Sequence, residues 1–270
     1  MRLGIHLPHA GEQATPALIR RFAIQADEIG IDDVWVSEHI IVPRDQFPRS
    51  PLFYDPVLSL TWAAATRVRL GTSVLVLPMR HPLPLAKELA TLHNFSDGRL
   101  ILGVGVGWLA PEFAALGVPF NERGRRLDEG LAMMRAVWSQ DPVTFRARHI
   151  PAVIEGMTMT PMPISPIPIW FGGSSDAALR RTARLGDGWH GSRETPEQAG
   201  AIVARLRAER PGEDFTVSMR VMWDGKDQGA LRAMVDAYAD AGVQHVMVAP
   251  VDRNVDDWDT VLVGVGRLVG

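Results

Sequence analysis

The stretch RLGTSVLVLPMRHPLPLAKELATLHNFSDGRLILGVGVGW, residues 69–108, decides the fold. Two short apolar runs, Leu70–Leu77 and Leu100–Val106, flank a segment in which Leu85, Leu89 and Leu92 recur at helical spacing. The stretch therefore predicts a strand, a helix and a second strand, with polar residues and glycines after each strand. In α/β proteins these strand-to-helix turns carry the functional residues, so the same stretch predicts both a fold class and a site.

The alternation of strand and helix extends over the rest of the chain. We expect strands at Arg2–Leu7, Asp33–Ser37, Leu70–Val74, Leu100–Val104, Ile167–Phe171, Asp187–His190, Phe215–Met222 and Val243–Ala249. We expect helices at Pro16–Ile29, Pro56–Ala65, Leu83–Phe95, Glu122–Trp138, Ser175–Arg184, Pro196–Glu209, Gln228–Ala241 and Asp256–Leu268. Eight such units predict an α/β fold of the TIM-barrel type, a single (β/α)8 domain over residues 1–270, with an open doubly wound sheet as the alternative. Asp141–Pro163 has no clean period and reads as an irregular excursion between strands four and five.

Composition excludes several classes of function. The net charge of −3 and the absence of a long Lys/Arg run speak against nucleic-acid binding. Without cysteine, the chain has no disulfide, iron–sulfur cluster or thiolate zinc site. The N-terminal segment turns polar too soon for a signal peptide, and no apolar run reaches the roughly 18 residues of a membrane span. We therefore expect a cytoplasmic protein that does not enter a membrane.

The motif WVSEH ends the second predicted strand with Glu38 and His39. Residues just past a barrel strand face the active site, so His39 is a candidate for acid/base chemistry or for contact with a cofactor ring. Glu38 is a weaker candidate because neighbours on a strand point in opposite directions. The alternative for both is a solvated loop residue or a buried side chain bonded to backbone.

Two glycine-rich turns follow later strands. The motif GVGVGW, which contains Gly105, Gly107 and Trp108, is spaced GxGxG rather than GxGxxG, and this spacing disfavours a dinucleotide-binding fold. Its glycines instead allow a flat ligand to approach the backbone closely. WFGGSS brings Gly172, Gly173 and Ser174 to the start of a helix, where N–H groups form an anion cradle suited to phosphate. Tight packing at the rim and an ordinary serine cap are the respective alternatives.

A metal site is not expected. His6 and His9 stand three apart on the first predicted strand and its continuation, so they point to opposite faces, whereas a barrel metallohydrolase needs two histidines at i and i+2. No other histidine pair has ligand spacing, and the chain contains neither a GxSxG elbow nor a P-loop.

Taken together, these segments resemble the bacterial luciferase-like superfamily, and within it the class that uses the deazaflavin coenzyme F420. The resemblance rests on SEH at Ser37–His39, LGTSVLVLP at Leu70–Pro78, LAKELATLHNFSDGRLILGVGVGW at Leu85–Trp108, EFAALGVPFNERGRRLDE at Glu112–Glu129, PIWFGGSSDAALRRTARLGDGWH at Pro168–His190 and AGVQHVMV at Ala241–Val248. It covers nearly the whole chain and implies a barrel that binds a flavin-type ring at the C-terminal ends of the strands.

The resemblance also implies roles for individual residues. A non-prolyl cis peptide within Thr72–Ser73–Val74 is expected to back the ring, and His39 is expected beside it. Gly172–Ser174 correspond to the phosphate turn and Glu112 to an acidic catalytic residue. His190, which ends the predicted strand Asp187–His190, is a further candidate for cofactor binding. The loop Ile40–Asp55 is shorter than is common in this class, and Trp108 stands where some F420 dehydrogenases have smaller residues.

Three functions compete at this point. The first is F420-dependent hydride transfer to or from a small organic substrate, and the second is an FMN-dependent monooxygenase supplied by a separate reductase. The third is a flavin-binding protein without turnover. Arg44, Arg49, Arg80 and Arg123 are candidates for binding the anionic tail of F420, and we expect a homodimer.

Overall fold

The structure is a computed structural model that describes residues 1–47, 49–210, 215–252 and 254–269. Its parallel sheet contains β1 (Arg2–His6), β2 (Asp33–Val36), β3 (Arg69–Thr72), β5 (Leu100–Gly105), β8 (Ile169–Gly172), β9 (Gly188–Gly191), β10 (Thr216–Trp223) and β11 (His245–Pro250). Their order is β3-β2-β1-β11-β10-β9-β8-β5, and the pairing of β3 with β5 closes the ring. The predicted (β/α)8 barrel is therefore confirmed, and the open sheet is excluded.

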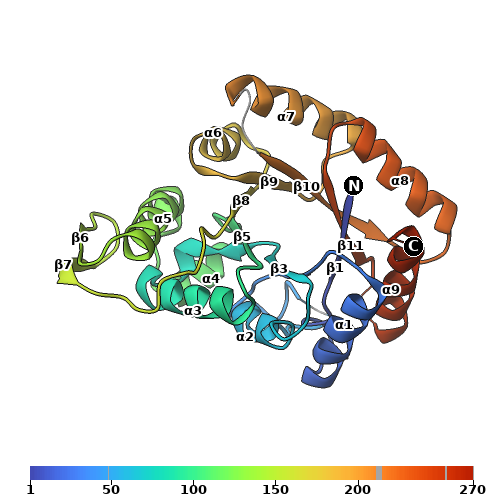
Figure 1. Cartoon of the computed structure of the whole chain (residues 1–270), viewed down its shortest axis with the longest axis horizontal. Coiled ribbons are helices and arrows are strands. Elements are labelled where there is room, and N and C mark those ends of the chain that lie inside the picture. Colours follow the sequence, from blue (N-terminus) through green and yellow to red (C-terminus); the bar gives the residue numbers. More distant parts are fainter. Residues whose placement is uncertain (48, 211–214, 253, 270) are drawn as a thin grey trace.

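Helices surround the barrel (Figure 1). They are α1 (Pro16–Ile29), α2 (Pro56–Thr61), α3 (Pro82–Phe95), α5 (Arg123–Ser139), α6 (Asp176–Leu185), α7 (Pro196–Glu209), α8 (Gln228–Asp240) and α9 (Val255–Val269). Local capping sets their starts: Thr15 accepts a hydrogen bond from Leu18 N, and Thr195 forms a capping box with Gln198. Gly30 ends α1 with a φ of 87°, a conformation that glycine adopts without strain. None of the helices described has the length and apolar character needed to span a membrane.

Several elements differ from the predictions. α2 stops at Thr61 because residues 62–66 tighten into turns with bonds between residues three apart. The segment β4 (Leu75–Val76) was not predicted; it follows Ser73 and pairs with the end of β5. α4 (Ala110–Ala115) and the 3-10 helices η1 (Leu77–Met79) and η2 (Phe120–Glu122) were also not predicted.

The excursion between the fourth and fifth barrel strands is more regular than predicted. It contains an antiparallel hairpin of β6 (Val143–Arg146) and β7 (Val153–Met157). Figure 1 shows this hairpin beside α5, at the periphery and away from the barrel strands. Most of its side chains are half-buried or exposed, so no continuous apolar pattern marks these strands in the sequence.

The interior of the barrel is partly aromatic. Trp35 and Trp170 are buried there, together with Ile101, Met247 and Ala249. A glycine on the adjacent strand makes the space: Gly71 of β3 pairs with Trp35, and a Cβ at Gly71 would lie 2.3 Å from the Trp35 ring. The large rings therefore depend on glycines elsewhere in the barrel wall.

Candidate active site

A cavity of about 1200 Å³ lies at the C-terminal ends of the barrel strands, where α/β barrels hold their active sites. Loops that follow most of the barrel strands line it. The volume exceeds the roughly 300–1,000 Å³ of typical ligand sites. The cavity therefore has room for a ring cofactor and a substrate together.

The floor of the cavity is formed by Ser73 and Val74, which follow β3. The peptide bond between them is cis, as the resemblance implied. Val74 packs between two glycines: a Cβ at Gly105 would come within 2.6 Å of its side chain, and one at Gly172 within 2.9 Å. Glycines at both positions thus allow the Val74 side chain to lie between β5 and β8 and to face the cavity.

His39 and Glu112 form one wall. Glu112, on α4, is buried and accepts hydrogen bonds from His39 Nδ1 at 3.1 Å, Ile40 N at 2.5 Å and Ile41 N at 3.1 Å. Burial alone would raise the pKa of Glu112, but the hydrogen bonds from His39 and the two backbone groups outweigh it and lower the pKa. An ionised Glu112 only accepts, so His39 donates from Nδ1 and keeps the Nε2 lone pair as its proton acceptor.

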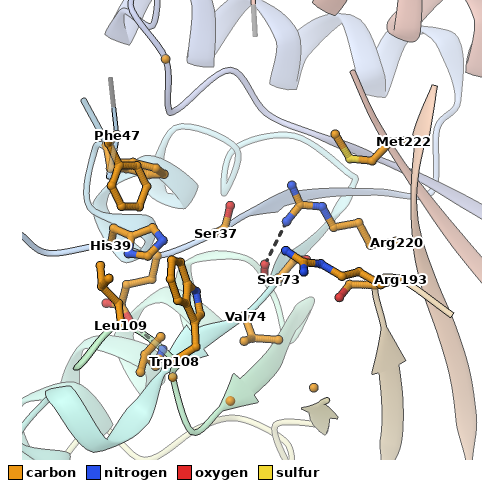
Figure 2. Close-up of a pocket in the computed structure, with 18 of the residues that line it drawn as sticks. Ser37, His39, Phe47, Ser73, Val74, Trp108, Leu109, Arg193, Arg220 and Met222 are labelled. Atoms are coloured by element: carbon orange, nitrogen blue, oxygen red, sulfur yellow. Dashed lines mark hydrogen bonds between the residues drawn. The ribbon is translucent and has the colours of Figure 1, made fainter. Parts of the chain in front are cut away.

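Aromatic side chains surround His39. Its ring meets Phe47 at 5.0 Å, Phe53 at 4.9 Å and Trp108 at 5.9 Å between centroids, each in an edge-to-face arrangement. Figure 2 shows His39 with Phe47 and Trp108 on one side of the cavity. Trp108 is 65% exposed, so its ring borders the mouth of the cavity and leaves one face open to a ligand.

Glu38 is also buried, but its carboxylate is engaged elsewhere. One oxygen accepts from Val76 N at 2.5 Å and the other from Arg80 Nε at 2.5 Å, while Arg80 also bonds Asp55 at 2.5 Å. Burial raises the pKa of Glu38, against the opposing charge of Arg80. These contacts make Glu38 a residue that holds β4 in place, although its side chain borders the cavity.

The opposite side of the cavity is suited to anions. Gly173 has a φ of 93° and lies two residues before Ser175, the N-cap of α6, which accepts from Ala178 N at 3.3 Å. Arg193 and Arg220 line the same cavity, and in Figure 2 they lie across from His39 and Trp108. Backbone N–H groups at a helix start and two guanidinium groups together favour a negatively charged ligand.

Most of the predicted site residues are brought together. The cavity is lined by Glu38, His39, Ser73, Val74, Gly105, Gly107, Trp108, Glu112, Gly172, Gly173 and His190. Two predicted residues do not line it. Thr72 is buried beneath the floor, where its hydroxyl donates to Gly103 O at 2.7 Å, and Ser174 is exposed and bonds Glu194 instead.

Sequence reasoning missed other lining residues. Phe47 and Phe53 lie in the loop after β2, which carries no recognisable motif. Arg220 lies inside β10 rather than past its end, and Arg193 follows β9 by two residues. Alternation along β10 could have identified Arg220, because it shares the inward face with Ser218.

The predicted cationic contacts are corrected in part. Arg80 is enclosed by Glu38 and Asp55, so it is not placed to receive a cofactor tail. Arg123 packs on the Phe120 ring at 3.9 Å and donates to Phe120 O at 2.8 Å. Arg49 lines the cavity and pairs with Asp252 at 2.6 Å. Among the residues described, no three His, Asp or Glu side chains gather as a metal site would require.

Comparisons with known proteins agree with this architecture. The chain is 35% identical over 186 residues to an F420-dependent glucose-6-phosphate dehydrogenase of Kineococcus radiotolerans, covering 67% of this chain and 53% of the relative. It thus spans about half the length of the curated relatives it matches. An uncharacterized protein of Mycobacterium tuberculosis, Rv0940c, is 38% identical over 55% of this chain and 50% of its own length.

Solved structures share the fold at lower identity. The monooxygenase RslO1 from Streptomyces bottropensis superposes with a TM-score of 0.82 at 22% identity, over 100% of this chain and 99% of that one. An F420-dependent secondary alcohol dehydrogenase, solved with an F420-acetone adduct, superposes with a TM-score of 0.81 at 18% identity and 97% coverage of each chain. The family model for luciferase-like monooxygenases matches residues 1–259. With that match over nearly its full length, the chain belongs to the luciferase-like monooxygenase family.

Proposed function

We propose that this protein is an F420-dependent oxidoreductase that transfers a hydride to or from a small organic substrate. The observation that carries the proposal is the pairing of a buried carboxylate with His39 on one wall of a cavity whose far side is cationic. The relative from Kineococcus, which is named for F420 dependence, supports the choice of cofactor.

The residues present fit a flat anionic cofactor. At Val74 the floor has only a valine side chain with glycines on both sides, so no larger side chain stands in the way of a flat ring. Gly173 lies in a backbone conformation that other residues adopt only with strain. We expect the ring to lie over Ser73–Val74 and the phosphate at Gly172–Gly173. Arg193 and Arg220 would then face the negative charges. Bound F420 would supply a hydride donor or acceptor at its C5.

His39 would exchange the proton that accompanies hydride transfer. Its Nε2 lone pair accepts the proton of a substrate hydroxyl, or returns it to a carbonyl in the reverse direction. Glu112 stabilises the imidazolium that results, because its charge lies 3.1 Å from Nδ1. Phe47, Phe53 and Trp108 limit water around this pair, which strengthens the interaction.

The test measures the affinity of the purified protein for F420 and for FMN by fluorescence titration. We expect micromolar or tighter affinity for F420 and much weaker affinity for FMN, which lacks the oligoglutamate tail. Tight FMN binding with no response to F420 would instead favour the monooxygenase and its separate reductase. Binding of either cofactor with no substrate-dependent redox change would favour a carrier without turnover. The homodimer and the cytoplasmic location stay predictions.

A further inference from the structure

A continuous chain of polar side chains runs through the barrel beneath the cavity floor. Ser73 Oγ lies 2.8 Å from His190 Nε2, and His190 Nδ1 lies 2.7 Å from Ser218 Oγ. Ser218 Oγ lies 2.6 Å from His245 Nδ1, and His245 Nε2 lies 2.7 Å from Asp33 Oδ1. The chain therefore joins the cavity floor to Asp33, the first residue of β2 at the far end of the barrel.

These groups are sealed from solvent. Asp33, Ser218 and His245 are 0% exposed, and His190 is 2% exposed. Trp35 stacks on His190 at 4.9 Å with an interplanar angle of 5°. A barrel interior is ordinarily filled with branched apolar side chains, and well-packed apolar residues often stabilise a core as well as a buried ion pair does. A polar chain that ends at the cavity floor therefore points to a role in the site.

The charged end of the chain is Asp33. Burial alone would raise its pKa, but the charge and hydrogen bond of His245, with Arg69 and Trp35 Nε1, lower it to about 2. Arg69 bonds the second oxygen at 2.5 Å. Asp33 is therefore ionised and can only accept, so His245 must donate to it from Nε2.

The middle of the chain stays uncharged. Burial lowers the pKa of His190 to about 3, with further contributions from the charges of His245 and Arg220. The charged groups facing the chain are Arg69 from β3 at one end and Arg220 from β10 at the other. The charge of Arg220 lowers the pKa of His190, and the charge of Asp33 opposes this by raising it.

Two hydrogen-bond arrangements satisfy every group, and they differ by one proton. In the first, Ser73 donates to His190 Nε2, His190 donates from Nδ1 to Ser218, and Ser218 donates to a neutral His245. In the second, all three bonds are reversed: a cationic His245 donates to Ser218, Ser218 donates to His190 Nδ1, and His190 donates from Nε2 to Ser73. His190 is neutral in both arrangements and only exchanges its tautomer.

We propose that Ser73, His190, Ser218, His245 and Asp33 form a proton relay that stores one proton beneath the cofactor ring. A proton that reaches Ser73 Oγ forms a new O–H bond there while the original Ser73 proton passes to His190 Nε2. The Nδ1 proton of His190 passes to Ser218, and that of Ser218 to His245 Nδ1. One proton moves in total, no electron moves, and the charge rests beside Asp33. The relay rests on the proposed function only in placing a ring against Ser73.

The test uses nitrogen-15 NMR of the histidines in the ligand-free protein, titrated from about pH 9 to about pH 5, the range in which histidine changes charge. We expect His190 to carry its proton on Nδ1 while His245 is neutral. When His245 becomes cationic, the His190 proton should move to Nε2 in the same step. A His190 tautomer that ignores the charge of His245, an imidazolium on His190, or a His245 that never changes charge would each overturn the relay.

Ser218→Ala removes the buried hydroxyl that joins His190 to His245, and so interrupts the chain of hydrogen bonds. In this variant the His190 tautomer should no longer follow the charge of His245. Ser59→Ala is the matched control, because Ser59 is a buried serine on α2 whose hydroxyl has no partner among the residues described. It should leave the coupling unchanged. Persistent coupling in Ser218→Ala would overturn the relay.

Turnover separates the relay from the proposed function. With cofactor and substrate, Ser218→Ala should lower kcat about 10²-fold, the lower end of what a positioned proton-transfer group contributes, and leave KM unchanged. An unchanged kcat would remove the relay from the reaction. If the wild-type protein binds neither cofactor, the proposed function fails, whereas the coupled titration of His190 and His245 still decides whether the chain relays a proton.

Discussion

Glu112→Gln is the most direct test of the role proposed for the His39–Glu112 pair. Glu112 Oε1 accepts from the backbone of Ile40 and Ile41, and a glutamine carbonyl can keep those two bonds. The amide NH₂ would then lie at the position of Oε2, 3.1 Å from His39 Nδ1. Two donors cannot share a hydrogen bond, so His39 must move its proton to Nε2 and accept at Nδ1. The variant should therefore exchange the tautomer of His39.

The expected magnitudes follow from these contacts. Hydrogen bonds to a charged group contribute about 1.5–3 kcal/mol and neutral ones about 0.5–1.5 kcal/mol, so the variant should lose about 1–2 kcal/mol of stability and stay folded. Turnover should fall by about 10²–10⁴-fold, because the Nε2 lone pair that accepts the proton is gone. Cofactor affinity should change little, because the proposed phosphate site lies on the other side of the cavity.

The assay combines nitrogen-15 NMR of His39 with steady-state kinetics. Glu38→Gln is the matched control: it changes the second buried glutamate of the cavity, whose oxygens bind Val76 and Arg80 rather than His39. It should lower stability without moving the His39 proton. If Glu112→Gln keeps the Nδ1 tautomer and turns over within tenfold of wild type, the reasoning is refuted. A loss confined to Glu38→Gln would assign the catalytic carboxylate to Glu38.

Three further predictions concern the turn at Gly173, the stability of the protein in acid, and Arg193 on the cationic side of the cavity. Gly173→Val should weaken cofactor binding severely and lower stability, because φ is 93° and an added Cβ lies 3.4 Å from Ala178 Cβ; unchanged affinity by calorimetry would remove this turn from the site. His190 has its pKa lowered from 6.5 to about 3, so the unfolded chain binds a proton that the folded chain does not. Stability should be complete above pH 6.5 and fall by about 1.4 kcal/mol per unit below it. His190→Gln should lose this slope in chemical denaturation and His149→Gln should keep it; equal slopes would contradict the assignment. F420 affinity should fall with added salt, and Arg193→Ala should flatten that dependence, whereas an unaltered salt slope would exclude Arg193 from tail binding.

Local rules in the sequence were enough to predict the repeating units. Pro16–Ile29 and Pro196–Glu209 were predicted with both ends correct, because a threonine cap, a proline at the first turn and apolar spacing all agree. Most other elements were placed within one or two residues. Since each unit supplies one strand and one covering helix, eight of them predicted a closed barrel before any contact was known.

The short elements were not predicted, because an apolar period can be recognised only over a longer segment. β4 has two residues and α4 has six, which is too few for a period to emerge. The hairpin of β6 and β7 packs at the periphery and carries a mixed pattern. In these places contacts with the rest of the chain decide the conformation, and local propensity contributes little.

The site likewise has residues that local sequence indicated and contacts that only the tertiary structure shows. Strand ends and glycine turns in the sequence indicated His39, the Ser73–Val74 floor and the Gly172–Gly173 turn, because a parallel barrel brings all strand ends to one face. The pairing of His39 with Glu112 spans 73 residues, and the buried contact of His245 with Asp33 spans 212. No local pattern encodes such pairs. Only the closed barrel brings these groups together, because it places β11 beside β1 and β1 beside β2, and joins β3 to β5. Its packed interior also removes the water that would otherwise weaken the contact of His245 with Asp33.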